Sequence, residues 1–306
     1  ELMHLVEEAG IPAGVVNVIT GMGQEAGMPL VTHPLVRKVA FTGGEAAGRA
    51  INIAAAADFK KVTLELGGKS PNIVFEDADL DAAVPGAVSG IFAAAGQTCI
   101  AGSRLLLHDA IYEPFMERLL EMVRSARIGD PMDPATNISP VANAAQRDKI
   151  LSYIEIAKGE GATCLTGGAA VSPEGAEGYF VQPTIFADVR NEMRIAQEEV
   201  FGPVLSVIRF HDEAEAVRIG NDVLYGLAAG VWTSDLARAL RMSDALQAGT
   251  VWVNTYRSTS YTTPFGGYKR SGLGRENGAE AIKEYLQPKS VWLAEPQVVA
   301  NPFIRR

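Results

Sequence analysis

The sequence is poor in cysteine and has no long apolar run. Its two cysteines, Cys99 and Cys164, are too few for a disulfide framework, so a reducing compartment is the simpler interpretation and we expect a cytoplasmic protein. No stretch reaches the ~20 apolar residues that span a bilayer, and the longest candidate, 82–96, is interrupted by proline and glycine. Residues 1–8 form an acidic amphipathic pattern rather than a signal peptide. These features predict neither a disulfide-stabilised secreted domain nor a membrane partner.

The chain also has fewer positively than negatively charged side chains. The chain carries 27 Lys and Arg against 36 Asp and Glu, which gives a formal net charge of -9. Phosphate backbones are bound by clustered Lys and Arg, so this balance argues against a nucleic-acid partner. By contrast, 306 residues with 47% hydrophobic side chains suffice for two domains with sizeable cores.

Short β-branched runs alternate with amphipathic segments along most of the chain. This alternation predicts an α/β protein with a parallel sheet and covering helices. The predicted strands are 15–19, 36–41, 62–66, 72–75, 103–108, 162–165, 180–186, 204–210, 226–232, 249–254 and 290–293. The predicted helices are 2–9, 25–31, 45–57, 80–95 with a break at Pro85, 111–126, 146–159, 213–221 and 236–246. We divide the chain into one α/β unit over 1–68, a second over 69–287 and a tail over 288–306.

One cysteine lies where a nucleophile could be presented. The motif Gly96-Gln97-Thr98-Cys99 ends an apolar, helix-like run and places Cys99 in a tight polar turn. Loops on rigid scaffolds carry reacting groups, and a thiolate attacks electrophilic carbonyls well. The alternative is a free cysteine that packs as a small hydrophobe, which is how we interpret Cys164 in its predicted strand.

A carboxylate occupies an awkward position at the end of a predicted strand. Glu65 lies between Leu64 and Leu66, just before a double-glycine turn. Burial beside two leucines would raise its pKa towards the range that is useful to a general base. The alternative is a structural carboxylate that caps the turn or pairs with Lys69.

Three further segments suggest contacts with a nucleotide. Gly43, Gly44 and Gly48 follow a strand and open a helix, where backbone amides would face a pyrophosphate, although an ordinary strand-to-helix turn looks similar. Glu199 precedes another strand, where it would bind a ribose hydroxyl pair or form a solvated acidic turn. The glycine-rich basic loop 264–275 would hold phosphate or form a rigid cleft wall.

Together these segments resemble the NAD(P)-dependent aldehyde dehydrogenase superfamily, and the likeness runs from about residue 1 to 293. The segment 64–70 resembles the family's glutamate signature and 96–99 its cysteine signature. Glu65 and Cys99 lie 34 residues apart, as is typical of the family. The resemblance implies that Glu65 is the general base, that Cys99 is the nucleophile and that no metal takes part. It also implies oxidation of a small-molecule aldehyde to a carboxylic acid, through a thiohemiacetal and a thioester, with NAD or NADP as cofactor.

The same resemblance implies the other site residues. Those that would bind the cofactor are Gly43, Gly44, Gly48, Leu66, Gly67, Glu199 at the nicotinamide ribose and Phe201 beside the nicotinamide. Those that would face the aldehyde are Thr98, Ile100 and Phe265. The apolar side chains of Ile100 and Phe265 favour an apolar or small aliphatic aldehyde.

The resemblance also bears on architecture and assembly. It makes 1–68 the C-terminal part of a Rossmann-like dinucleotide-binding domain, 69–287 the catalytic domain and 288–306 a strand-containing tail through which homodimers or homotetramers form. The family usually has Ser in its pyrophosphate turn where this chain has Gly44, a loss of one hydrogen bond worth about 1 kcal/mol. Family members continue upstream of residue 1 with an oxyanion-hole asparagine and ribose-binding residues, so we expect little activity from 1–306 alone.

Other functions stay open on the sequence. A CoA-acylating dehydrogenase would use the same cysteine but typically lacks the base, so Glu65 argues against it. A cofactor-independent thiol esterase would need Cys99 but no dinucleotide site. A non-catalytic descendant would tend to lose Cys99 or Glu65, and both are present.

Overall fold

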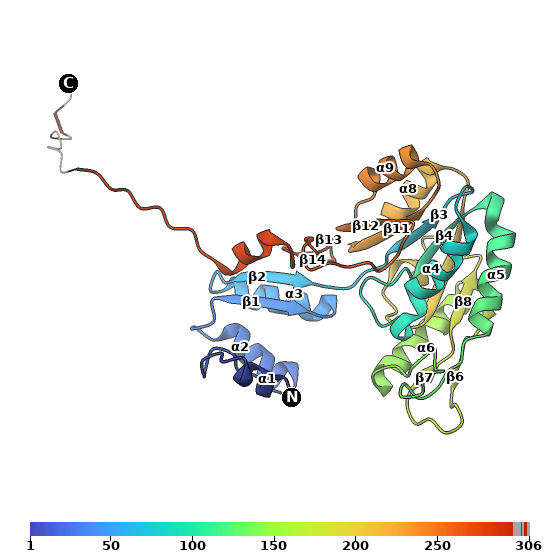
Figure 1. Cartoon of the computed structure of the whole chain (residues 1–306), viewed down its shortest axis with the longest axis horizontal. Coiled ribbons are helices and arrows are strands. Elements are labelled where there is room, and N and C mark those ends of the chain that lie inside the picture. Colours follow the sequence, from blue (N-terminus) through green and yellow to red (C-terminus); the bar gives the residue numbers. More distant parts are fainter. Residues whose placement is uncertain (296–300, 302, 305–306) are drawn as a thin grey trace.

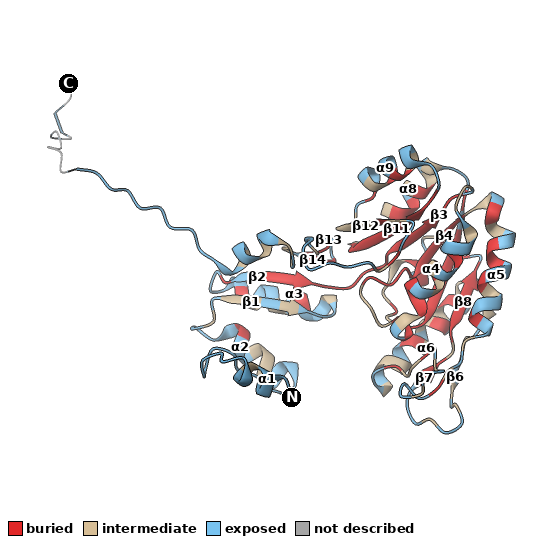
Figure 2. Cartoon of the chain, viewed as in Figure 1, coloured by how far each residue is buried: buried red, intermediate tan, exposed pale blue. Residues whose placement is uncertain are grey.

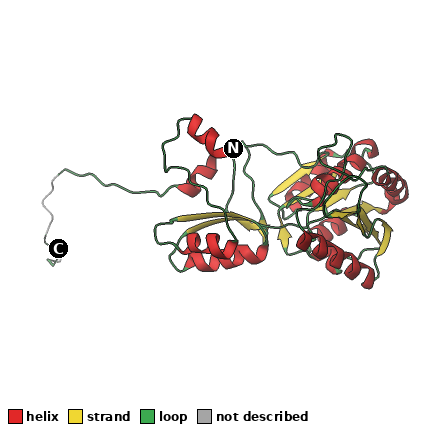
Figure 3. Ribbon diagram, turned by 90° about the horizontal axis from the view of Figure 1, so that it is seen from below, coloured by secondary structure: helices red, strands yellow, loops and turns green. Residues whose placement is uncertain are grey.

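The computed structural model describes residues 1–295, 301, 303 and 304. It consists of a smaller lobe, a larger lobe and an extended C-terminal segment (Figure 1). Figure 3 shows the same two lobes from a second direction. Among the described residues, no helix combines the length and the apolar character that crossing a membrane requires.

The larger lobe is built on a seven-stranded sheet in the order β12-β11-β3-β4-β9-β8-β5, in which every neighbouring pair is parallel except β8 and β5. Its strands are β3 (Pro71–Val74), β4 (Arg104–His108), β5 (Thr163–Thr166), β8 (Thr184–Ala187), β9 (Val204–Phe210), β11 (Ala228–Trp232) and β12 (Thr250–Val253). Its helices are α4 (Leu80–Phe92), α5 (Tyr112–Arg124), α6 (Ala144–Gly159), α7 (Arg194–Gln197), α8 (Glu213–Asn221) and α9 (Leu236–Ala245). The predicted α/β class is confirmed.

The central strands are buried, which explains why their sequences are continuously apolar. In β4, Leu105, Leu106 and Leu107 are fully buried, and Figure 2 shows the sheet as the most buried part of the lobe. The helices that cover it are amphipathic: α4 packs on β3 and β9, α8 on β3, and α9 on β11 and β12. The sheet therefore gives the loops at its edges a rigid support.

The smaller lobe holds a three-stranded sheet assembled from two distant parts of the chain. β1 (Lys38–Thr42) runs parallel to β2 (Lys61–Glu65), and α3 (Glu45–Ala56) connects them. β14 (Gly272–Leu273) pairs antiparallel with β2 and lies opposite Glu65. The boundaries that we predict at 68/69 and 287/288 stay predictions.

The remaining elements are α1 (Leu2–Glu8), a π-helical turn (Gly23–Gly27), α2 (Met28–Thr32), β6 (Ala170–Val171), β7 (Phe180–Val181), β10 (Tyr225–Gly226), β13 (Tyr268–Lys269) and 3-10 turns at Ala93–Gly96, Asp109–Ile111 and Ala279–Tyr285.

Four predicted strands are wrong. Residues 226–232 belong to two strands in different sheets, because β10 ends at Gly226 and β11 begins at Ala228. Residues 15–19 form turns and loop with exposed side chains, because no other described strand lies beside them to pair with. Residues 180–186 form two strands in different sheets, since Pro183 between β7 and β8 has no N–H to donate. Residues 290–293 form no strand, and Trp292 is 94% exposed. In the predicted tail, residues 296–300, 302, 305 and 306 lie outside the described residues.

The predicted break at Pro85 is also wrong. α4 is continuous through this proline, which leaves one backbone hydrogen bond unmade. Val84, Ala87 and Ile91 of the same helix are buried against the sheet, and this packing outweighs the missing bond. The Asp79 side chain caps this helix, because it accepts a hydrogen bond from the Asp81 N–H of the first turn.

Candidate active site

The turn that carries Cys99 begins where α4 ends. The 3-10 turn Ala93–Gly96 contains two alanines with positive φ, and Gly96 follows with φ +71°. A Cβ atom at Gly96 would overlap the carbonyl group of Gly202. Only glycine allows this close approach in this backbone conformation, so the Cys99 turn is seated directly against the segment that follows Phe201.

Glu65 ends β2 and is buried, with 4% of its surface exposed. Its Oε2 atom has no hydrogen-bond partner among the described residues. Burial first, and then the Glu276 carboxylate, raise the pKa of Glu65 to about 7, although Arg275 opposes them. This is the rise in pKa that its position between two leucines predicts. The alternative of a Glu65–Lys69 pair is wrong, because the Lys69 amine also has no hydrogen-bond partner among the described residues.

The double-glycine turn after Glu65 brings three predicted site residues together. The Gly68 N–H donates to Oε1 of Glu199 at 3.1 Å, and a Cβ atom at Gly67 would overlap the same carboxylate. A Cβ atom at Gly68 would come within 2.5 Å of the Cys99 carbonyl oxygen. The turn thus contacts the Glu199 carboxylate and the backbone of the Cys99 turn, and it follows Glu65 in the chain after one residue, Leu66.

The electrostatics of this cluster raise the pKa of the cysteine thiol. Burial, the Glu199 carboxylate and the Glu65 carboxylate raise the pKa of Cys99, whereas the backbone N–H groups of Ile100 and Cys99 itself lower it. Burial also raises the pKa of Glu199, and the hydrogen bond from the Gly68 N–H only partly opposes this rise. A thiol with a raised pKa needs a proton acceptor before it can act as a nucleophile.

The segment after Glu199 is held by a residue that the sequence did not reveal. Phe201 has φ +56°, and Gln146 of α6 donates from Nε2 to the carbonyl oxygens of Val200 and Phe201 at 3.0 and 2.8 Å. Gln146 lies 55 residues away from Phe201 in the chain. Only the packing of α6 beside this loop identifies it, and we find no sequence signal that would have done so.

The three predicted phosphate-loop glycines differ in what surrounds them. Gly44 is the N-cap of α3 with open space beside it, and no described side chain caps this helix. A Cβ atom at Gly48 would lie 2.5 Å from the side chain of Leu66, so Gly48 permits close packing of α3 on β2. Gly43 donates its N–H to the Glu65 carbonyl at 3.0 Å. Free amides for an anion are therefore found at Gly44 and the first turn of α3.

An apolar cavity of about 440 Å³ lies beside this helix. It is lined by residues of the π-helical turn, α2, β1 and α3, including Gly23, Met28, Val39, Phe41, Ala47 and Ile51. Sequence analysis missed it because its walls come from four separate elements.

The three residues predicted to face the aldehyde are in different environments. Thr98 has a buried Oγ1 atom with no hydrogen-bond partner among the described residues. Ile100 is buried in the hydrophobic core, and its carbonyl accepts a hydrogen bond from Tyr256 at 3.0 Å. Phe265 is half-buried and exchanges two backbone hydrogen bonds of 2.7 Å with Glu276. Their contact with an aldehyde stays a prediction.

Comparison with known proteins assigns the chain to a family. The sequence profile described as the Aldehyde dehydrogenase family matches residues 1–291. The chain belongs to the aldehyde dehydrogenase family. It is 52% identical over 288 residues to an aldehyde dehydrogenase of Emericella nidulans, which covers 94% of this chain and 57% of that protein. It is 50% identical over 303 residues to betaine aldehyde dehydrogenase of Brucella anthropi, which covers 99% of this chain and 62% of that protein.

A solved aldehyde dehydrogenase structure has the same fold. The aldehyde dehydrogenase of Bacillus cereus, in its NAD+ complex, matches with a TM-score of 0.92 and 46% identity, covering 95% of this chain and 58% of that one. The chain thus spans between 57% and 62% of the length of these relatives. The predicted family resemblance is confirmed, whereas the roles of individual residues stay predictions.

Proposed function

We propose that the enzyme containing this aldehyde dehydrogenase chain oxidises an aldehyde to a carboxylic acid with NAD or NADP. The observation that supports it most directly is the Gly67-Gly68 turn, which follows Glu65 in the chain, contacts the Glu199 carboxylate and packs on the Cys99 backbone. The proposed reaction needs a nucleophile, a base that titrates near neutral pH and a polar group for the cofactor ribose. These three residues are of the right chemical types.

The residues around them fit a dinucleotide. The uncapped amides at the start of α3, with open space at Gly44, suit a pyrophosphate. The apolar cavity beside α3 suits a flat heterocycle such as adenine. Glu199 would accept hydrogen bonds from the nicotinamide ribose hydroxyls, and Phe201 would lie beside the ring. When bound, the nicotinamide supplies the hydride acceptor.

The residues of this chain would carry out the covalent and proton-transfer steps. Glu65, with a pKa of about 7, would take the proton of the Cys99 thiol as Sγ attacks the aldehyde carbon. The Cys99 backbone N–H would stabilise the oxyanion of the thiohemiacetal. Hydride loss leaves a thioester on Sγ, and Glu65, having released its first proton to solvent, would deprotonate the attacking water. The Sγ–carbon bond then breaks and releases the acid.

Substrate and assembly are part of the same proposal. The Brucella anthropi relative is named a betaine aldehyde dehydrogenase, so betaine aldehyde is one substrate to test. Small aliphatic aldehydes are the other, because Ile100 and Phe265 favour apolar groups. We also propose a homodimer or homotetramer.

The test is an aldehyde panel on the enzyme expressed from its whole reading frame. We expect at least one aldehyde to yield reduced dinucleotide, measured by absorbance, and free acid, measured by chromatography. Product formation that requires CoA would favour the acylating alternative, and ester hydrolysis without dinucleotide reduction would favour the esterase. No dinucleotide reduction with any aldehyde would contradict the proposal.

A further inference from the structure

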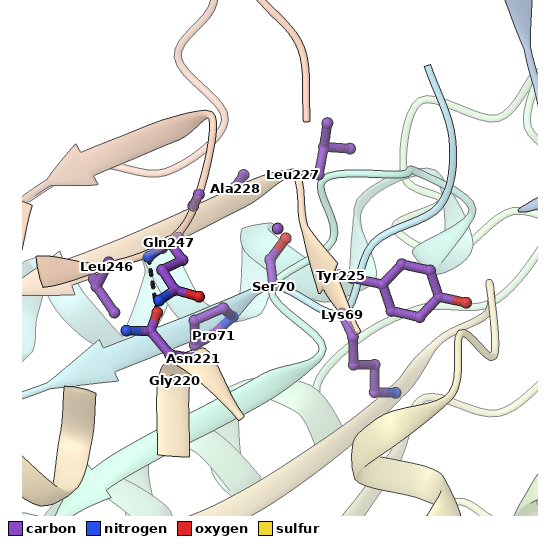
Figure 4. A pocket seen from close by; sticks show the side chains of 13 residues that line it. Lys69, Ser70, Pro71, Gly220, Asn221, Tyr225, Leu227, Ala228, Leu246 and Gln247 are labelled. Carbon is purple, nitrogen blue, oxygen red and sulfur yellow. Dashed lines mark hydrogen bonds between the residues drawn. The ribbon is translucent and has the colours of Figure 1, made fainter. Parts of the chain in front are cut away.

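A lysine amine is buried beneath the site without a partner. Lys69 follows the Gly67-Gly68 turn, is 1% exposed, and its Nζ atom has no hydrogen-bond partner among the described residues. Figure 4 shows Lys69 and Tyr225 on one side of a small pocket whose other side is formed by Asn221 and Gln247. A buried ammonium group without a partner costs several kcal/mol, so its presence calls for a nearby negative charge.

The backbone around Lys69 is fixed, but its amine is not. Arg104 donates from Nε to the Lys69 carbonyl at 2.9 Å. The other Arg104 nitrogens donate to the side-chain oxygen of Asn191 and to the carbonyls of Ile219 and Gly220, at 2.8 to 3.0 Å. Arg104 is therefore a second buried cation whose hydrogen bonds go to neutral acceptors, and it offers Lys69 no negative charge.

The charged groups facing Lys69 are Glu199 and Glu198 from the loop after α7, Arg104 from β4 and Lys149 from α6. Burial and Arg104 lower the pKa of Lys69 to about 7, while Glu199 and Glu198 act to raise it. Burial raises the pKa of Glu199, whereas the Gly68 N–H, then Lys149 and then Lys69 act to lower it. Lys149 is exposed, so solvent screens its charge, whereas the charge of Lys69 acts within the protein.

The two glutamates are not equivalent partners. Glu198 already accepts hydrogen bonds from the Tyr153 hydroxyl at 2.6 Å and from Arg194 at 2.8 and 2.9 Å. Glu199 accepts one described hydrogen bond, from the Gly68 N–H at 3.1 Å. The buried cation that remains to balance Glu199 is Lys69.

We propose that Lys69 is a positioning residue for the cofactor: its buried amine keeps the Glu199 carboxylate ionised against the Gly67-Gly68 turn, ready to accept ribose hydroxyl hydrogen bonds. The inference rests on the proposed function for the identity of the ribose. Without Lys69, Glu199 would hold a proton at low pH and lose one acceptor. The apo fold would lose nothing, because methionine fills a similar volume without burying a charge.

The test measures binding and stability rather than turnover, in the enzyme from its whole reading frame. The variants are Lys69→Met, Glu199→Gln, the double variant and, as a matched loss of one positive charge, Lys158→Met on the exposed end of α6. Dissociation constants for NADH and NADPH are measured by fluorescence from pH 6 to pH 9. Thermal midpoints are measured without cofactor, and Lys69→Leu is a second replacement if Lys69→Met does not fold.

We expect Lys69→Met to weaken dinucleotide binding roughly tenfold at pH 6, where loss of the nearby positive charge favours the protonated Glu199, and hardly at all at pH 9. Its thermal midpoint should not fall, and Lys158→Met should bind normally. In the Glu199→Gln background, the Lys69 replacement should add nothing. Normal dinucleotide binding by Lys69→Met at pH 6 would overturn this inference and leave the proposed function standing. So would an equal loss of binding when Lys69 is replaced in the unaltered enzyme and in Glu199→Gln. An unaltered enzyme that binds neither dinucleotide would instead contradict the proposed function.

Discussion

Glu65 and Cys99 owe their chemistry to burial. Glu65 is buried and Cys99 is half-buried, and burial is the largest cause of the raised pKa of each side chain. One of these pKa shifts would favour the proposed reaction and the other would hinder it. A carboxylate with a pKa of about 7 becomes a stronger base, whereas a thiol with a raised pKa becomes harder to ionise. In the proposed reaction, the Cys99 thiol therefore needs a proton acceptor, the role proposed for Glu65.

The first prediction concerns the base. Glu65→Gln keeps the size of the side chain but cannot accept a proton, so thioester hydrolysis should slow by about 10²–10⁴. A burst of NADH can persist in stopped-flow measurements while steady turnover collapses, provided that Cys99 finds another proton acceptor. Steady turnover like that of the unaltered enzyme would remove Glu65 from this role.

The pH profile tests the same residue. A carboxyl with a raised pKa works as a base only when deprotonated, so the rate of thioester hydrolysis should rise with pH through about 7 and then level off. In single-turnover measurements, Glu65→Gln should lose this inflection. A profile with its inflection near pH 4 would mean that burial does not raise the pKa of Glu65 in the working enzyme.

The second prediction separates the two cysteines. Cys99→Ala should abolish aldehyde oxidation and any ester hydrolysis, because both need the covalent intermediate. Cys164→Ala should leave turnover nearly unchanged, since this half-buried thiol contacts the Thr166 carbonyl on an edge strand of the sheet. The reverse result, an inactive Cys164→Ala and an active Cys99→Ala, would overturn the assignment.

At the scale of elements, the Cys99 turn depends on two close approaches. Gly96 packs on the Gly202 carbonyl, and Gly68 packs on the Cys99 carbonyl. Three segments therefore meet without side chains between them: the loop between β2 and β3, the turn after α4, and the loop before β9. The geometry of the site is set by backbone contacts, which a single methyl group disturbs.

The third prediction tests one of these contacts. Gly96→Ala should lower the free energy of unfolding by about 2–4 kcal/mol, because positive φ and overlap with Gly202 act together, and turnover should fall as the turn shifts. Gly175→Ala is the matched control: its φ of +72° is similar, but nothing lies near its Cβ position. It should cost only about 1 kcal/mol by urea denaturation. Equal losses would show that φ alone, and not the contact, makes glycine necessary.

At the scale of the whole molecule, the smaller lobe exposes much apolar surface. β1 is an edge strand with an unpaired side, and the side chains of 15–19 lie largely in solvent. Such surfaces favour association.

The fourth prediction follows from that surface and from the greater length of the relatives. Residues 1–306 expressed alone should associate in light scattering and show little dehydrogenase activity on an aldehyde that the reading frame extended upstream oxidises well. Equal rates from the two proteins would contradict this expectation, and a monodisperse 1–306 would contradict its physical reason.

Local side-chain patterns determined much of the fold before any tertiary contact was known. The strand predicted over 204–210 and the helix over 213–221 match β9 and α8 residue for residue. Their periodicity and capping depend on near neighbours in the chain. The same holds for Glu65, whose two flanking leucines already predicted the raised pKa.

Only the tertiary structure decided the features that depend on distant neighbours. A β-branched run such as 15–19 becomes a strand only beside a partner. Pro85 stays in a helix because the buried face of that helix packs on the sheet. Lys69 lies four residues after Glu65, yet the Lys69 amine and Oε2 of Glu65 are both without a hydrogen-bond partner among the described residues. Gln146 and the apolar cavity arise from elements that meet only after folding. Sequence spacing determines which groups are available, and long-range packing determines which of them meet.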